Sequence, residues 1–190
     1  MKLTEIQNDL KNRLSERRYV HSAGVAASAY MLAEKYGYDP EKAELAGWLH
    51  DCAKEMKLRE MQDIIDKQNL QVDEYMRSSR ALLHGPAGSI MVKTVYGIED
   101  RDIQDAIFFH TTGHPQMGLL DKIIFLADYI EPGRDFPGIN IIRKNAKKDL
   151  DVAVLSAYDA TIRYLLEQKE YIYELTFFGR NDLIKHMGNK

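Results

Sequence analysis

The stretch Ala46-Gly47-Trp48-Leu49-His50-Asp51-Cys52-Ala53-Lys54 places an imidazole, a carboxylate and an amine directly after an apolar run. Asp51 follows apolar residues and precedes Cys52 and Ala53, so we expect it to face the interior. A buried carboxylate is costly unless it is paired or bound to a metal. Lys54 lies three residues further on, so we expect it on the same side of a continuing helix as His50 and Asp51. An internal ion pair with Asp51 is the simplest alternative to a functional role for both.

Two more residues extend this pattern on either side of the pair His50-Asp51. His21 lies upstream among small residues, and Asp128 lies downstream at the end of the apolar run 123–127. A lone histidine such as His21 is more often a hydrogen-bonded core residue, whereas an acid in so apolar a helix indicates a ligand or an acid–base group. Two imidazoles and two carboxylates are the donor set of a hydrolytic metal site, and they admit iron, manganese, nickel or zinc.

Apolar residues recur at helical spacing along almost the whole chain, and no run of alternating β-branched residues indicates a strand. We therefore predict one all-α domain, a helical bundle spanning residues 1–190, without repeats or a linker. Caps and glycines set the expected bounds. The predicted helices cover about 3–14, 15–36, 39–50, 58–68, 84–97, 100–113, 119–130 and 150–169, followed by a short helix that ends near 188.

Composition limits the classes of protein to consider. The net charge of −3 argues against a nucleic-acid binder with a broad basic face. The single cysteine, Cys52, excludes an internal disulfide and favours a reducing compartment, so we expect the cytoplasm; a small core residue is its simplest interpretation. No signal peptide is evident, and no apolar run is long enough to cross a bilayer, so we expect no membrane partner.

The ordered set His21, His50-Asp51 and Asp128, with Lys54 in an HDxxK arrangement, resembles the H…HD…D signature of the HD superfamily of metal-dependent phosphohydrolases. The stretches 46–54, 110–115 and 121–134 are similar to the bacterial YqeK-type HD proteins. The resemblance covers nearly the whole chain. It implies a single HD domain and an iron-dependent hydrolase that cleaves diadenosine tetraphosphate symmetrically into two ADP molecules.

The resemblance also implies roles for individual residues. His21, His50, Asp51 and Asp128 would hold the metal, and Asp51 and Lys54 would be catalytic. Residues expected to contact the substrate are Arg18, Asp51, Lys54, His84, His110, Thr111, Asp128, Arg134, Tyr173, Leu175 and Thr176.

The histidines His84 and His110 leave two interpretations open. Each follows an apolar stretch, so each is expected to face inward. They could complete a second metal site, or they could face phosphates, since an imidazolium donates hydrogen bonds to phosphate. We favour the phosphate role, because no further acid accompanies them. His114 and His186 are expected to be surface residues.

Other functions remain open from the sequence alone. The chain could act on another nucleotide, such as a dNTP, a nucleoside diphosphate or a cyclic nucleotide. It could also be a nucleotide-binding regulator with a non-catalytic metal site, although a complete ligand set with Lys54 argues against that interpretation. The sequence does not set the oligomeric state, and a homodimer is compatible with small HD proteins of this type.

Overall fold

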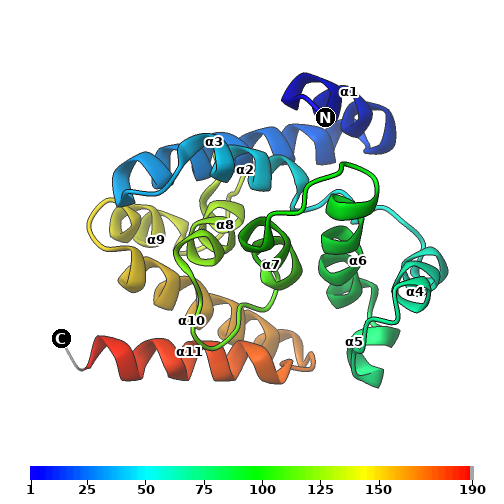
Figure 1. Ribbon diagram of the computed structural model, residues 1–190. Coiled ribbons are helices and arrows are strands. Elements are labelled where there is room, and N and C mark those ends of the chain that lie inside the picture. The colour runs from blue at the N-terminus through cyan, green and yellow to red at the C-terminus, as the bar shows by residue number, and fades with distance from the viewer. Residues whose placement is uncertain (189–190) are drawn as a thin grey trace.

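The structure is a computed structural model, and it describes residues 1–188. These residues form eleven helices and no strand, so the predicted all-α class is confirmed (Figure 1). The helices are α1 (Leu3–Arg13), α2 (Glu16–Tyr36), α3 (Pro40–Leu49), α4 (Leu58–Lys67), α5 (Glu74–Ser78), α6 (Arg80–Thr94), α7 (Arg101–Phe109), α8 (Leu119–Ile130), α9 (Ile139–Ala146), α10 (Leu150–Gln168) and α11 (Glu174–Met187).

Helix α8 is the centre of the bundle. It packs against α2, α3, α7, α9 and α10, which surround it in Figure 1. Its residues from Ile123 to Ala127 are all buried, as expected for a helix that is apolar on every side. A polar side chain that follows this run, such as Asp128, therefore lies close to the middle of the protein.

Two glycines allow the helices that carry the site to approach each other closely. A Cβ on Gly47 of α3 would lie 2.7 Å from the Cα of Ala26 on α2, and a Cβ on Gly24 would lie 2.7 Å from Oε2 of Glu131. Gly47 has no room for a side chain, because its close neighbour is backbone, whereas a side chain at Gly24 would displace the carboxylate of Glu131. The sequence of small residues in α2 and α3 thus brings His21, His50 and the end of α8 together.

Local signals set several helix ends as predicted. Asp39 caps α3 by accepting hydrogen bonds from two backbone amides, with Pro40 in the first helical position. Gly37 ends α2 in the left-handed conformation, with φ 76°. The side chain of Asp100 likewise accepts a hydrogen bond from a backbone amide in the first turn of α7.

Several predicted bounds were wrong. Helix α6 begins at Arg80, about one turn before the predicted start at His84. Pro86 therefore lies inside the helix instead of in its first turn. The short helices α5 and α9 were missed, and α11 has 14 residues, so it is not short. Helix α3 ends at Leu49, so the residues from His50 to Lys54 form turns instead of continuing the helix.

Candidate metal centre and active site

The four predicted metal ligands converge on one point inside the bundle. Nε2 of His21 lies 3.3 Å from Nε2 of His50 and 3.1 Å from Oδ1 of Asp128. Oδ2 of Asp51 lies 3.7 Å from Nε2 of His21 and 3.5 Å from Nε2 of His50. Ligand atoms about 2.1 Å from one ion lie about 3–3.5 Å from their neighbours, so this spacing fits a divalent metal.

The two imidazoles of this quartet are held with Nε2 toward the centre. Nδ1 of His50 donates to the carbonyl of Gly47 at 2.7 Å, and Nδ1 of His21 donates to Oε1 of Glu131 at 3.1 Å. Because carbonyl and carboxylate oxygens only accept, both Nε2 atoms keep a lone pair for a metal. Fixed tautomers of this kind are typical of metal-binding histidines.

Glu131 is a positioning residue that the sequence analysis missed. It is buried, and besides His21 it accepts a hydrogen bond from the backbone of Gly133 at 2.5 Å. Its place offered a signal, because an acid directly after the apolar helix α8 and before Pro132 and Gly133 needs a partner. Here that partner is a histidine of the metal quartet.

Asp51 is the most enclosed carboxylate of the quartet, with 3% of its side chain exposed. Burial alone would raise the pKa of its carboxyl, but His50, His110 and His84 outweigh burial and hold that pKa well below its ordinary range. Its Oδ2 accepts a hydrogen bond from Arg18 at 2.5 Å, so Arg18 lies directly beside the quartet.

Oδ1 of Asp51 accepts no hydrogen bond among residues 1–188, although Nε2 of His84 lies 3.1 Å away. A buried carboxylate oxygen without a hydrogen bond is unfavourable in a protein interior. A bound cation or ligand would satisfy it. The quartet spacing, which runs through Oδ2 of Asp51, is the observation that fits a metal between the four side chains, whereas Oδ1 faces His84.

Asp128 faces the more open side of the centre. Burial would raise the pKa of its carboxyl, but His21, His50 and Arg134 outweigh burial and keep that pKa well below its ordinary range. Arg134 donates to Oδ1 of Asp128 at 2.5 Å and to its backbone carbonyl at 2.9 Å. Arg134 therefore lies next to the centre.

Arg143 of α9 fixes the loop that carries Arg134, and no motif in the sequence indicated this role. Its guanidinium donates to the carbonyls of Ile130, Glu131 and Arg134 at 2.8–3.1 Å. Three backbone carbonyls at a helix end are thereby satisfied by one side chain. The loop after α8 is consequently held in a defined position beside the metal centre.

A second pair of histidines lies on the other side of Asp51. Nε2 of His84 lies 2.9 Å from Nε2 of His110, and Nδ1 of His110 donates to the carbonyl of Ile107 at 2.7 Å. The hydroxyl of Thr111 lies 3.1 Å from Nε2 of His110. These two histidines and Asp51 form a second set of potential metal-binding atoms, all within 4.8 Å of one another.

Lys54 points into this part of the site. Its Nζ lies 3.1 Å from Nε2 of His84 and 3.9 Å from Oδ1 of Asp51. Lys54 and Asp51 thus form an ion pair, as the simplest alternative predicted, but at a distance too long for a hydrogen bond. Burial lowers the pKa of Lys54, and the charges of Asp51 and Asp128 offset part of that effect.

The phosphate role predicted for His84 assumed a positively charged imidazolium, and the surroundings of the ring do not favour that charge. The pKa of His84 is lowered to about 4, chiefly because the ring is completely buried; Asp51 opposes this shift and the charge of Lys54 adds to it. At neutral pH the ring is uncharged, and its Nδ1 has no hydrogen-bond partner among residues 1–188. His84 therefore offers a neutral imidazole to a ligand, and the positive charge on this side comes from Lys54.

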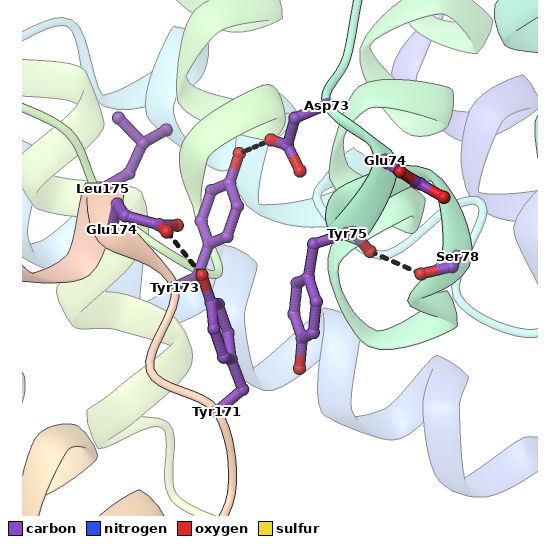
Figure 2. A pocket seen from close by; sticks show the side chains of 8 residues that line it. All are labelled: Asp73, Glu74, Tyr75, Ser78, Tyr171, Tyr173, Glu174 and Leu175. Carbon is purple, nitrogen blue, oxygen red and sulfur yellow. Dashed lines mark hydrogen bonds between the residues drawn. The ribbon is translucent and has the colours of Figure 1, made fainter.

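Tyr173 and Leu175 lie at a separate cavity of about 700 Å³ between α5 and the start of α11. Figure 2 shows the rings of Tyr75, Tyr171 and Tyr173 grouped at this cavity, with the hydroxyl of Tyr173 bonded to Asp73. Ser78 of α5 lines this cavity, and α6, which carries His84, begins directly after Ser79.

Thr176, the third residue predicted in this stretch, is buried in the first turn of α11. Its backbone amide donates to the carbonyl of Tyr173 at 3.0 Å. It thus contributes to the shape of the segment that carries Tyr173 and Leu175.

The remaining predictions for single residues have mixed outcomes. Cys52 is buried in the core, as predicted, and His186 is exposed at the surface. The prediction for His114 was wrong, because this residue is only partly exposed and its Nε2 lies 3.1 Å from Oδ2 of Asp121. The pair joins the loop after α7 to the first turn of α8.

Known proteins share both the sequence pattern and the fold of this chain. A model of the HD domain matches residues 18–133, which include the whole metal quartet. The chain therefore belongs to the HD domain family. In solved structures, it matches a Clostridium acetobutylicum protein described as a predicted HD superfamily hydrolase involved in NAD metabolism. The TM-score is 0.95 at 42% identity, over 98% of each chain.

Two curated relatives cover most of the chain as well. A Halalkalibacterium halodurans protein is 46% identical over 175 residues, which are 92% of this chain and 93% of the relative. A Bacillus subtilis protein is 39% identical over 175 residues, 92% of this chain and 94% of the relative. Both are named bis(5'-nucleosyl)-tetraphosphatase, symmetrical.

Proposed function

We propose that this chain is a metal-dependent phosphohydrolase that cleaves diadenosine tetraphosphate symmetrically into two ADP molecules. The observation that carries the proposal is the position of cations on both sides of one buried quartet of His and Asp side chains. Lys54 lies beyond Asp51, and Arg134 lies beyond Asp128. A polyphosphate that crosses the quartet would meet a positive charge on each side. The names of the curated relatives agree with this activity.

The metal ligands in this proposal are His21, His50, Asp51 and Asp128, and the metal is iron. Their nitrogen and oxygen donors equally suit manganese, nickel or zinc, so elemental analysis of the purified protein decides its identity. A bound divalent ion supplies Lewis-acid polarisation of a phosphoryl oxygen and lowers the pKa of a water molecule that it holds.

The protein's own residues bind and orient the substrate. Lys54 and Arg134 offset the negative charge that accumulates on the phosphates as the central phosphoanhydride bond breaks. Arg18 holds Oδ2 of Asp51, which leaves Oδ1 free to orient the attacking water. His84, His110 and Thr111 line the space next to that oxygen, where they would hold phosphate oxygens of one ADP half.

The nucleoside of that half would extend toward the cavity of Tyr173 and Leu175. Aromatic faces such as those of the three tyrosines in Figure 2 bind bases by stacking. Thr176 supports the same segment from within α11.

Product analysis tests the proposal. Metal-loaded protein is offered diadenosine tetraphosphate, dNTPs, nucleoside diphosphates and cyclic nucleotides, and the products are separated by chromatography. ADP as the sole product from the dinucleotide supports the proposal. Release of AMP and ATP from it, or turnover of only another nucleotide, supports a different phosphohydrolase. Binding without turnover of any of them supports a regulator.

Three further proposals concern the whole chain. Residues 1–190 form one HD domain, because α9 and α10 pack on α8 and α11 packs on α10, outside the matched range 18–133. The protein is cytoplasmic, in keeping with one unpaired, buried cysteine. It forms a homodimer, which light scattering of the purified protein checks. Within residues 1–188, no helix combines the length and apolarity that a bilayer span requires.

A further inference from the structure

A symmetrical dinucleotide presents two identical nucleosides, and the site described so far accounts for one of them. Beyond Asp51 lies His84 of α6, and Ser79 at the start of α6 directly follows Ser78, which lines the tyrosine cavity of Figure 2. Cleavage at the central anhydride bond places the metal quartet between the two halves. The second half would extend from the quartet on another side, and Asp128, with 21% of its side chain exposed, is more open than His21, with 10%.

A separate cavity of about 630 Å³ opens on that side. It is bounded by the end of α8, the loop that follows it, and the last turns of α10. Its lining includes both Asp128 of the quartet and Arg134, so an occupant would touch the metal centre directly. A volume of this size is typical of pockets for small molecules, which span roughly 300–1,000 Å³.

Three of the residues that line this cavity are aromatic. Tyr129 and Phe136 pack edge to face, with ring centroids 5.4 Å apart. Tyr164 of α10 also lines the cavity, and it is 60% exposed, so its ring is accessible to a ligand. Exposed aromatic ring faces bind a nucleotide base by stacking, whichever base it is.

The polar residues of the cavity are arranged for the rest of a nucleotide. Arg134 lies next to the quartet, where phosphates would be. Arg163 and Glu167 lie further out on the same face of α10, and neither has an ion pair or hydrogen bond among residues 1–188. A free guanidinium suits a phosphate or a base edge, and a free carboxylate suits ribose hydroxyls or an exocyclic amine.

We propose that this cavity, lined by Tyr129, Arg134, Phe136, Arg163, Tyr164 and Glu167, binds the second adenosine half of diadenosine tetraphosphate. The assignment rests on the proposed function, because only a substrate with two nucleosides needs two such sites. It also explains why an enzyme of this kind would prefer a dinucleoside polyphosphate over a nucleotide with a single base.

The first test removes the exposed ring. Tyr164→Ala should raise the KM for diadenosine tetraphosphate about tenfold, equivalent to about 1.4 kcal/mol, and leave kcat nearly unchanged. Leu166→Ala is the matched control, because Leu166 lies two residues away on α10, is 63% exposed and does not line the cavity. Arg163→Ala serves as a second variant in the same cavity. Since both side chains are exposed, thermal unfolding should stay at the wild-type midpoint.

A substrate with one nucleoside provides the second arm. Adenosine tetraphosphate can bind with its base in the tyrosine cavity, so its KM should change much less in Tyr164→Ala than the KM for the dinucleotide. Calorimetric titration gives a readout without turnover: metal-loaded wild type should bind ADP at two sites, and Tyr164→Ala should lose one of them.

The outcomes separate the two proposals. If wild type converts the dinucleotide to ADP while Tyr164→Ala and Arg163→Ala keep the wild-type KM, the second site is wrong and the proposed function stands. An equal rise of KM for both substrates also overturns the second site. If wild type does not release ADP from the dinucleotide, the proposed function fails and the second site fails with it.

Discussion

The two pairs of histidines in the site are built almost alike. In each pair the Nε2 atoms approach closely, at 3.3 Å for His21 and His50 and 2.9 Å for His84 and His110. His50 and His110 both follow the last residue of a helix, α3 or α7. Each donates Nδ1 at 2.7 Å to the carbonyl three residues earlier, which also satisfies a free carbonyl at the helix end.

The charges around the pairs are different. The pair His21 and His50 lies between the carboxylates of Asp51 and Asp128, with Glu131 behind His21. Nε2 of His84 and of His110 lie 3.1 Å and 3.5 Å from Oδ1 of Asp51, and the amine of Lys54 lies beside His84. Asp128 also comes within 4.8 Å of His110, but it contacts His21 more closely, at 3.1 Å. Carboxylates offset the charge of a divalent ion, whereas an amine repels it and attracts phosphate. We therefore expect the neighbours of each histidine pair, and not the imidazoles themselves, to decide what the pair binds.

The largest expected effect comes from removing the carboxylates. Asp51→Ala and Asp128→Ala should each abolish metal binding, and activity should fall by about three orders of magnitude or more, because both the ion and its orientation are lost. Elemental analysis and turnover measure the two effects. Asp121→Ala on α8 is the control, since Asp121 contacts His114 and not the quartet. If a variant keeps its metal but is inactive, that aspartate is an acid–base group instead of a ligand.

Replacing the positively charged Lys54 should reduce activity less than removing either aspartate. Lys54→Met should keep the metal and the fold and weaken polyphosphate binding about ten- to hundredfold, because one charge-assisted contact is worth roughly 1.5–3 kcal/mol. Steady-state kinetics on diadenosine tetraphosphate measure the change, with Lys57→Met as the control at a lysine three residues away. Unchanged kinetics would return Lys54 to the role of a structural partner for Asp51.

Glu131, which accepts a hydrogen bond from Nδ1 of His21, provides the next test of how the two histidine pairs differ. Glu131→Ala should weaken metal affinity about tenfold or somewhat more, since outer partners that orient a ligand typically contribute this much. Glu131→Gln keeps an oxygen for Nδ1 of His21 and should recover part of the affinity. Metal titration of the stripped protein measures both variants. Equal affinities in wild type and Glu131→Ala would remove the positioning role.

The smallest expected effect is on stability, and it comes from His114. Its substitution tests how much the charge of the imidazole ring contributes. Burial would lower the pKa of His114, but Asp121 outweighs burial and the pKa is raised, in contrast to the lowered pKa of His84. A raised folded-state pKa stabilises the protein below the unfolded-state pKa of about 6.5, and this stabilisation disappears as the pH rises through the folded-state pKa.

His114→Gln should therefore destabilise the protein by about 1 kcal/mol at pH 5.5 and by less at pH 9. Denaturant unfolding at the two pH values measures the difference. A loss of stability that is the same at both would show that the contact of His114 with Asp121 does not depend on the charge of the ring.

Much of the fold and the metal quartet could be predicted from the sequence. Helical spacing is strong in segments such as α8, and a carboxylate that follows an apolar run, as Asp128 does, needs a cation beside it. The short helices α5 and α9 escaped because five and eight residues show little periodicity. Glu131 and Arg143 escaped because their roles depend on partners brought close by folding. The charge state of His84 depends on complete burial, which no local pattern reveals.

The difference between the two histidine pairs is tested most directly by the metal content of the His84→Ala variant, measured together with its affinity for ADP. If the pair His84 and His110 binds phosphate, wild type holds about one ion per chain, His84→Ala keeps that ion, and its ADP affinity falls. The contradicting result is about two ions per chain in wild type, with one lost in His84→Ala and ADP affinity unchanged.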